Sequence, residues 1–219
     1  MAWTLGTTAT SAYNNTPDTV PFTCSATAKL IVVSVWINGT TARAGGVPTY
    51  NGIPLTDSGQ AFVFNAGGEC GTSLFYLVEP LTGAAYDLVL PNTNSVFGLM
   101  SIASYIPATG KTASAVNSWQ ATGTTANPSV ATTSVAGNLL VGTLGSGYKN
   151  VPTAGTNMTI INTRDVGNQT WGDEYDLSAG ANQAVAFVQN ADDWGLIAME
   201  FAEADIAVPR RIFITQVGT

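Results

Sequence analysis

The stretch that decides the fold lies between residues 47 and 106. It contains three segments: VPTYNGIPLT (47–56), SLFYLVEPLTGAAYDLVL (73–90) and VFGLMSIASYI (96–106). The first carries Tyr50-Asn51-Gly52, and Asn-Gly accepts the positive φ that tight hairpin turns require. In the second, the turn Pro80–Gly83 separates two runs of strand length. Short apolar and aromatic runs separated by turns predict antiparallel β-strands.

Strand-like runs continue on both sides of this stretch. Leu30–Ile37 (LIVVSVWI) is almost continuously apolar and rich in β-branched residues, which predicts a central strand buried on both faces. Thr109–Ala136 consists mostly of Thr, Ser, Ala and Asn, so we expect a long connection with one short strand around Trp119. Further strands are expected at Thr19–Cys24, Asn138–Leu144, Met158–Arg164 and Gln183–Val188.

The segment Trp194–Phe201 has a mixed signal. Its Leu, Ala, Met and Glu residues favour a helix, whereas Ile197, Met199 and Phe201 alternate as they would in a strand. We predict a strand. The expected total is about ten strands without a helix, which indicates an antiparallel β-sandwich or jelly roll. We expect a single domain over residues 1–205, followed by a C-terminal extended arm or final strand at 206–219, and no internal repeat of about 20–50 residues.

Composition narrows the possible functions. The chain has 219 residues, of which 45% are hydrophobic, so a packed core is expected. Only 10% are charged and the net charge is −7, against a usual charged fraction of about 25%. Nucleic-acid binding is not expected, because it needs a cluster of phosphate-neutralising cations. A low-charge surface suits either packing within an assembly, where each buried charge costs desolvation, or a neutral lectin-like surface.

No membrane span or signal peptide is expected, because no apolar run approaches 18 residues and the start, MAWTLGTTATS, lacks a basic and an apolar region. We therefore expect synthesis in a cytoplasm. Cys24 and Cys70 are an even pair, and in a reducing compartment buried thiols are favoured over a disulfide. Bridging after release into an oxidising medium stays open.

The order of these segments resembles the concanavalin-like jelly-roll proteins of tailed bacteriophages and related bacterial surface proteins. The resemblance rests on Leu30–Val35, the Tyr50–Thr56 turn, the Phe75–Gly83 turn and strand 97–106, and more loosely on Asn138–Val141 and the 183–201 strands. It implies a lectin-like, all-β jelly roll located in a virion, as a capsid decoration, cement, head-fibre or tail component. The implied partners are other virion proteins and further copies of the chain, for instance in a trimer.

Catalytic chemistry is poorly supported. The chain has no histidine, which removes the commonest general base and the Ser-His-Asp arrangement. PATGKT (107–112) ends like a phosphate-binding loop, but Tyr105 stands where the motif needs a glycine. Glu174-Tyr175-Asp176 begins an alternating carboxylate pattern that ends at Ala179, so a solvated edge is preferred over a glycosidase pair. We expect no enzyme, no catalytic residue and no required cofactor.

Two ligand classes remain open. The acidic residues Asp173, Glu174, Asp176, Asp192 and Asp193 are expected in two loops that could bind calcium, although no Asp-x-Asp-x-Asp spacing supports this. Trp119 and Trp171 lie in polar contexts, where an exposed indole could stack on a host-surface glycan. Trp36 and Trp194 are instead expected in the core.

The C-terminal segment after Pro209 is the candidate for contact with a partner subunit. Either it completes the sandwich, or it adds a strand to a neighbouring subunit. The candidate contact residues are Arg211, Ile212, Phe213, Ile214, Thr215, Gln216 and Val217. Together these observations predict a non-enzymatic virion structural protein that forms homo-oligomers. The alternatives are a carbohydrate-binding module or receptor-binding tail domain and, third, a polysaccharide-cleaving enzyme.

Overall fold

The computed structural model describes residues 3–11, 18–38, 46–65, 68–91, 97–147, 151–166 and 169–206. These residues form seventeen β-strands and no helix. Every strand pairing is antiparallel. The predicted all-β antiparallel sandwich is therefore confirmed, with more strands than the ten expected.

The first half of the chain forms two sheets. The first large sheet has the order β1 (Thr4–Thr10), β9 (Phe97–Ile106), β3 (Leu30–Asn38), β7 (Gly68–Val78), β6 (Thr56–Asn65). The first small sheet has the order β2 (Asp18–Thr23), β8 (Ala85–Leu90), β4 (Thr49–Tyr50), β5 (Ile53–Pro54).

The second half also forms two sheets. The second large sheet has the order β10 (Lys111–Gly123), β17 (Trp194–Asp205), β12 (Leu139–Ser146), β15 (Gln169–Asp176), β14 (Thr159–Val166). The second small sheet has the order β11 (Ser129–Val130), β16 (Val185–Val188), β13 (Thr153–Ala154).

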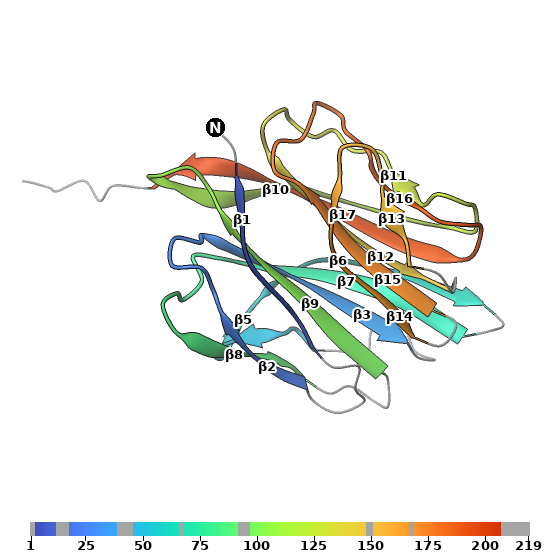
Figure 1. Cartoon of the computed structure of the whole chain (residues 1–219), viewed down its shortest axis with the longest axis horizontal. Helices are drawn as coiled ribbons and strands as arrows, with labels where there is room; N and C mark the ends of the chain where they lie inside the picture. Colours follow the sequence, from blue (N-terminus) through green and yellow to red (C-terminus); the bar gives the residue numbers. More distant parts are fainter. Residues whose placement is uncertain are drawn as a thin grey trace, which may run out of the picture.

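The four sheets stack as layers, with the two large sheets in the middle and a small sheet outside each (Figure 1). Side chains alternate along each strand, so each large sheet buries both of its faces. Along β3, Ile31 and Val33 pack toward the first small sheet, whereas Leu30 and Val32 pack toward the second large sheet. The predicted central strand at Leu30–Ile37 is confirmed.

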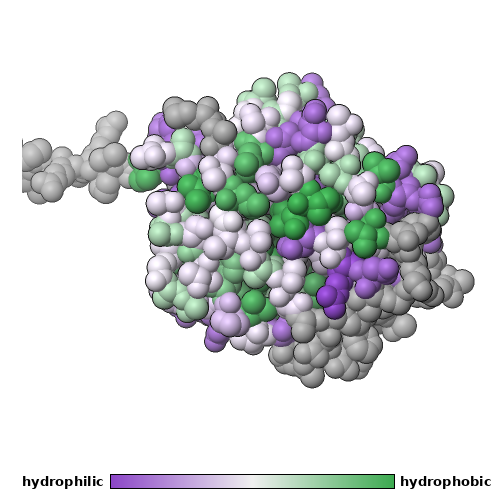
Figure 2. Space-filling view, viewed as in Figure 1, coloured by the Kyte–Doolittle hydropathy of each residue, from purple (hydrophilic) through white to green (hydrophobic). Residues whose placement is uncertain are grey.

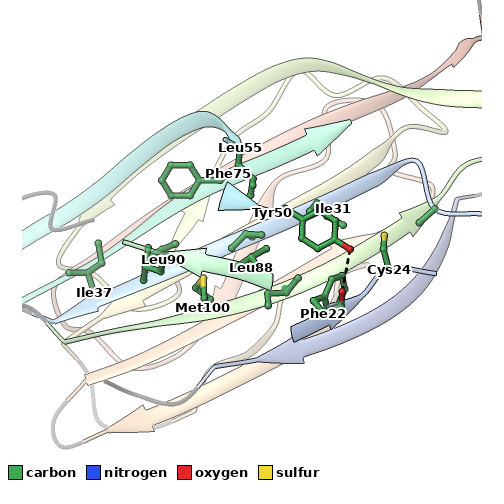
Figure 3. Close-up of a cluster of buried hydrophobic side chains, with 14 residues drawn as sticks. Phe22, Cys24, Ile31, Ile37, Tyr50, Leu55, Phe75, Leu88, Leu90 and Met100 are labelled. Atoms are coloured by element: carbon green, nitrogen blue, oxygen red, sulfur yellow. Dashed lines mark hydrogen bonds between the residues drawn. The ribbon is translucent and has the colours of Figure 1, made fainter. Parts of the chain in front are cut away.

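The first core, between the first two sheets, is almost entirely apolar (Figure 3). Its main polar feature is Tyr50, whose hydroxyl donates to the carbonyl of Phe22 at 3.2 Å. Tyr50 ends β4 at the predicted hairpin. Asn51 and Gly52 have φ values of 50° and 78°, so the Asn-Gly turn prediction is confirmed.

The two halves have the same strand order. In each large sheet the first strand of the half lies at one edge, beside the last strand. The strands β1-β9-β3-β7-β6 of the first large sheet correspond one by one to β10-β17-β12-β15-β14 of the second. In the small sheets, β2-β8-β4 corresponds to β11-β16-β13. Strands β1, β3, β7 and β9 alternate along the chain with the strands of the small sheet, which is compatible with a jelly roll. The jelly roll and the single domain over residues 1–205 stay predictions.

The bulges of the edge strands establish which residues correspond. In β6, the bulge falls between the pairs Asp57–Phe75 and Gly59–Leu74; in β14 it falls between Ile160–Glu174 and Asn162–Asp173. Leu74 thus corresponds to Asp173, and Phe75 to Glu174. The structural repeat is about 100 residues long, which a search for repeats of about 20–50 residues does not detect.

The second pair of bulges gives the same correspondence independently. The bulge in β1 follows the pair Leu5–Tyr105, and the bulge in β10 follows Ala115–Phe201. Tyr105 pairs with Leu30, four residues before Ser34, the partner of Leu74. In the other half, Phe201 pairs with Leu139 and Asp173 pairs with Thr143. Leu139 and Thr143 are again four residues apart on the central strand.

Two expectations about individual segments have clear outcomes. The strand at Trp194–Phe201 is confirmed, since it lies within β17. The strand predicted around Trp119 is confirmed, but the long connection predicted for the rest of Thr109–Ala136 is wrong, because Lys111–Gly123 forms the thirteen-residue edge strand β10. The sequence underestimates the length of this strand because it has one exposed flank and is built of small polar residues rather than alternating apolar ones.

Candidate functional site

The strongest concentration of buried polar chemistry lies between the two large sheets, in the layer that we call the seam. At one end of the seam the two backbones nearly touch. A Cβ atom added to Gly195 would lie 2.5 Å from the carbonyl oxygen of Ala61, and one added to Gly145 would lie 2.8 Å from the carbonyl carbon of Gly71. Only glycine permits this close approach.

An aromatic and hydroxyl cluster joins the halves next to this close contact. Trp36 and Trp171 stack with ring centroids 6.3 Å apart and planes 12° apart. The Trp36 indole N–H donates to the Thr143 hydroxyl at 3.1 Å, and the Thr72 and Thr143 hydroxyls are 2.7 Å apart. The Trp171 indole N–H donates to the Gly71 carbonyl at 3.3 Å. Each indole is thus buried with its polar edge satisfied across the seam.

Asp173 is the charged residue at the centre of the seam. It is 3% exposed, and burial raises the pKa of its carboxyl to about 6, against the opposing effect of hydrogen-bonding groups on Ser101 and Ser34. Its Oδ1 atom has no hydrogen-bond partner. The hydroxyl of Ser101 itself accepts a 2.7 Å hydrogen bond from the Asn162 amide, which lies at the β14 bulge.

Glu174 points to the opposite face of the same strand and holds the second small sheet. Its carboxyl accepts hydrogen bonds from the backbone N–H of Gly155 at 3.2 Å and of Ala186 at 3.1 Å. The side chain is fully buried, and this burial raises its pKa to about 8. Glu174 therefore replaces ladder bonds that the two-residue strand β13 is too short to make.

Glu200 has a similar structural task at another connection. It is fully buried and accepts hydrogen bonds from the Val135 N–H at 2.6 Å and from the side-chain amides of Asn138 and Asn117 at 2.8 and 3.4 Å. Asn117 follows the bulge of β10. The carboxylate thus fixes both the bulge and the segment that leads into β12.

These three carboxyl groups are not arranged for acid–base catalysis on an external substrate. Asp173 and Glu174 are consecutive in β15, so they face different layers. Glycoside hydrolysis needs two carboxyl groups on one cleft about 5–10 Å apart. The buried groups instead stabilise the packing of layers.

The predicted glycan-stacking residues have different environments. Trp171 is fully buried in the seam, so it cannot stack on a sugar from solvent; its polar sequence context reflects the hydroxyl cluster. Trp119 lies on β10. It is partly buried against the apolar core between the second large sheet and the second small sheet. Trp36 and Trp194 are buried, as expected.

The predicted acidic loops are placed differently from expectation. Asp173, Glu174 and Asp176 belong to strand β15 rather than to a loop, whereas Asp192 and Asp193 do lie in the turn before β17. Among the described residues, no three His, Cys, Asp or Glu side chains are grouped as they would be to hold a metal ion. Asp173 could have been placed in a strand from its spacing, because Trp171, Asp173 and Tyr175 are two residues apart and would share one face of a strand.

Both cysteines are buried free thiols. Burial raises the pKa of Cys24 to about 11 and that of Cys70 to about 12. Thiols held in this form are poor nucleophiles at neutral pH. The candidate partner-contact residues Arg211 to Val217 lie outside the described residues. Within the described part of the chain, no helix is long and apolar enough to cross a membrane.

An open hollow of about 370 Å³ lies beside the second small sheet. Its lining is small and uncharged, and the residues are Thr156, Asn157, Gly180, Ala181, Gln183, Ala184 and Ala186. The Gln183 amide within it already donates to Asp176 at 2.9 Å. The hollow has the volume of a small-ligand site but lacks an aromatic wall.

Comparisons with family models, with curated proteins and with solved structures find no match to this chain. The resemblance to the phage jelly-roll proteins therefore stays a prediction.

Proposed function

We propose that this protein is a non-enzymatic structural component of an assembled particle, namely a bacteriophage virion in which it packs against capsid or tail proteins. The resemblance of its turn motifs supports the setting. The surface supports the packing role, as the exposed positions of the first small sheet show. On β2 and β8 these are Thr19, Pro21, Thr23, Ala85 and Asp87, of which Asp87 alone is charged.

A neutral face is suited to burial against another protein. The centres of protein interfaces are depleted in charged residues, because a buried charge must be desolvated. The face of the molecule drawn in Figure 2 is consistent with this composition, since pale residues of intermediate hydropathy cover much of it and strongly hydrophilic ones occur in small groups. This low charge of the surface is the observation that carries the proposal.

The solution mass of the purified full chain, measured by light scattering, tests the proposal. We expect a closed oligomer whose mass is unchanged between about 0.01 and 1 M salt, although the Debye length falls from roughly 30 to 3 Å over that range. Contacts between neutral surfaces do not depend on screening. A chain that stays monomeric at every concentration, or dissociates as salt is added, contradicts assembly through these surfaces.

Carbohydrate binding is the second candidate, and the uncharged hollow beside the second small sheet favours it. Amide and hydroxyl groups such as those of Asn157 and Thr156 hydrogen-bond to sugar hydroxyls without bringing charge. A titration of the full chain with host-surface glycans, followed by NMR, should shift the Asn157 amide if this site binds. Trp119→Ala serves as the control for stacking at the other predicted position.

A further inference from the structure

The seam contains a polar pocket on one side of the repeat only. Asp173 corresponds to Leu74 in the first half, and the facing residue Ser101 corresponds to Ile197, because Ser101 pairs with Ser34 and Ile197 pairs with Thr143. Leu74 and Ile197 belong to the apolar part of the seam. The shared fold is therefore compatible with apolar residues at both positions, and the polar pair is a local specialisation.

The pocket contains a cavity of about 10 Å³. Its polar lining is Asp173, Glu174, Tyr105, Ser34 and Ser101, and the rest is Gly142 and apolar side chains, Leu74 among them. Asp173 is 3% exposed and Tyr105 is 0% exposed. The Asp173 Oδ1 atom and the Tyr105 hydroxyl oxygen both lack a hydrogen-bond partner. Two buried polar atoms without a partner thus belong to residues that line one cavity, each from a different half of the chain.

We propose that this cavity is a binding site for one water molecule, which donates a hydrogen bond to Asp173 Oδ1 and accepts one from the Tyr105 hydroxyl. A cavity of about one probe sphere, roughly 10–15 Å³, is sufficient for a single water. A buried polar atom left without a partner is destabilising, so one bridging water removes two such costs. The water joins β9 to β15, and hence the two halves.

The chemistry of the pocket favours water over a metal ion. A calcium ion takes about six to eight oxygen ligands. Two carboxyl residues line the pocket, Asp173 and Glu174, but the Glu174 carboxyl already accepts from the Gly155 and Ala186 N–H groups. The remaining oxygen atoms, those of Asp173, Ser34, Ser101 and Tyr105, are too few for such a ligand set. The cavity also has room for no ligand larger than one water.

The site is linked to protonation of Asp173. The titratable groups around it are Tyr105 from β9 and, on its own strand, Glu174 and Tyr175. Strands β3 and β12 contribute only the uncharged Ser34, Trp36 and Thr143. Burial raises the pKa of Asp173 to about 6 from 3.8. The folded protein therefore binds the Asp173 proton more tightly than the unfolded chain does. The stabilisation from this bound proton is complete below the unfolded pKa and is lost as pH rises toward 6.

A high-resolution crystal structure of the full chain tests the water directly. We expect one solvent peak about 2.7–3.0 Å from both Asp173 Oδ1 and the Tyr105 hydroxyl oxygen. In Tyr105→Phe the peak should be lost or displaced. A pocket without a solvent peak overturns the proposal. A peak at about 2.3–2.6 Å from six or more oxygen atoms overturns it in favour of a cation.

The counterpart residue supplies a matched solution test. Asp173→Leu installs the residue that the first half has at this position, and Asp173→Asn keeps the shape if the leucine variant does not fold. In either variant the unfolding free energy should fall less steeply between about pH 4 and 6 than in the wild type, by up to one proton. Leu88→Ala, a truncation in the first core away from this pocket, is the control and should leave that slope unchanged. An unchanged slope in both Asp173 variants contradicts a proton-linked site.

Discussion

The two halves of the chain share a strand order and two bulge positions but use different chemistry at corresponding positions. The first half has Leu74 and Phe75 where the second has Asp173 and Glu174. Ser104, in the first half, corresponds to Glu200, since they pair with Ile31 and Leu140, one residue after Leu30 and Leu139. All three buried carboxylates of this set lie in the second half.

The size of the small sheets explains part of this difference. The first small sheet has four strands, two of them six residues long, and its core is apolar. The second has three strands of two, four and two residues. Short strands leave backbone N–H groups without ladder partners, and the two oxygen atoms of a buried carboxyl group can accept from two of them. In the second half, side-chain acceptors therefore supply the hydrogen bonds that the short strands of the small sheet cannot make.

Truncation of the corresponding pair Phe75 and Glu174 gives the largest expected effects. At pH 5, Phe75→Ala should destabilise the protein by roughly 3–5 kcal/mol through an apolar cavity. Glu174→Ala should cost roughly 2–5 kcal/mol, because the Gly155 and Ala186 N–H groups lose their acceptor. Urea denaturation measures both costs.

Hydrogen exchange distinguishes the two mechanisms. The Gly155 and Ala186 amides should exchange faster in Glu174→Ala and unchanged, relative to global stability, in Phe75→Ala. Glu174→Gln, which retains one carbonyl acceptor, should lie between the wild type and Glu174→Ala. Equal protection of these amides in all variants contradicts the role assigned to the carboxylate.

The pH dependence of the same pair sharpens the comparison. Burial raises the pKa of Glu174 to about 8 from 4.5, so its folded form binds the proton more tightly than its unfolded form. The stabilisation is complete below about pH 4.5 and is lost as pH rises to about 8. The cost of Glu174→Ala should therefore shrink over that range, whereas the cost of Phe75→Ala should stay constant. A parallel pH course for both variants would refute this assignment.

The sequence predicts the strands and turns of the first half better than those of the second. Leu30–Ile37 and Tyr50-Asn51-Gly52 carry local signals, a continuous apolar run and a turn with positive φ, that do not depend on distant residues. Strand β10 lacks such a signal, because its position is fixed by pairing with β17. Its Thr, Ser and Ala residues read equally well as a connection.

The candidate site and the repeat depend on long-range pairing that one sequence does not reveal. Leucine corresponds to aspartate at 74 and 173, and serine to glutamate at 104 and 200, so the halves share no recognisable residue pattern there. Charged residues are rarely fully buried, which is why the acidic run around Asp173 indicates a solvated loop. Only the register shows that it is an inner strand.

The glycines at the closed end of the seam give a smaller expected effect. Gly195 corresponds to Leu99, so this position too differs between the halves. Gly195→Ala should destabilise by roughly 1–3 kcal/mol, because its Cβ would meet the Ala61 backbone oxygen at 2.5 Å. Gly98→Ala is the matched control, since its Cβ would lie at an ordinary 3.5 Å from the nearest atom. Equal thermal shifts for both variants would show that the sheets can separate at this end without cost.

The smallest expected effect is at the rim of the seam, where Glu79 joins the halves from outside. Lys29 donates to it at 2.8 Å from the first half, and the Thr112 hydroxyl donates to it from the second. Partial burial opposes ionisation, but these hydrogen bonds outweigh it and hold the pKa of Glu79 below its usual value.

Glu79→Gln should therefore cost less than about 1 kcal/mol, because both charged partners are substantially exposed and screened by solvent and salt. The sign of its pH dependence is opposite to that of Glu174. A lowered pKa gives stabilisation that is present at neutral pH and lost as pH falls through the folded value. Urea denaturation at neutral and at acid pH should show the cost of Glu79→Gln vanishing in acid, whereas that of Glu174→Ala grows. If Glu79→Gln destabilised the protein as much as Glu174→Ala, surface charge rather than packing in the seam would be the main interaction that joins the halves.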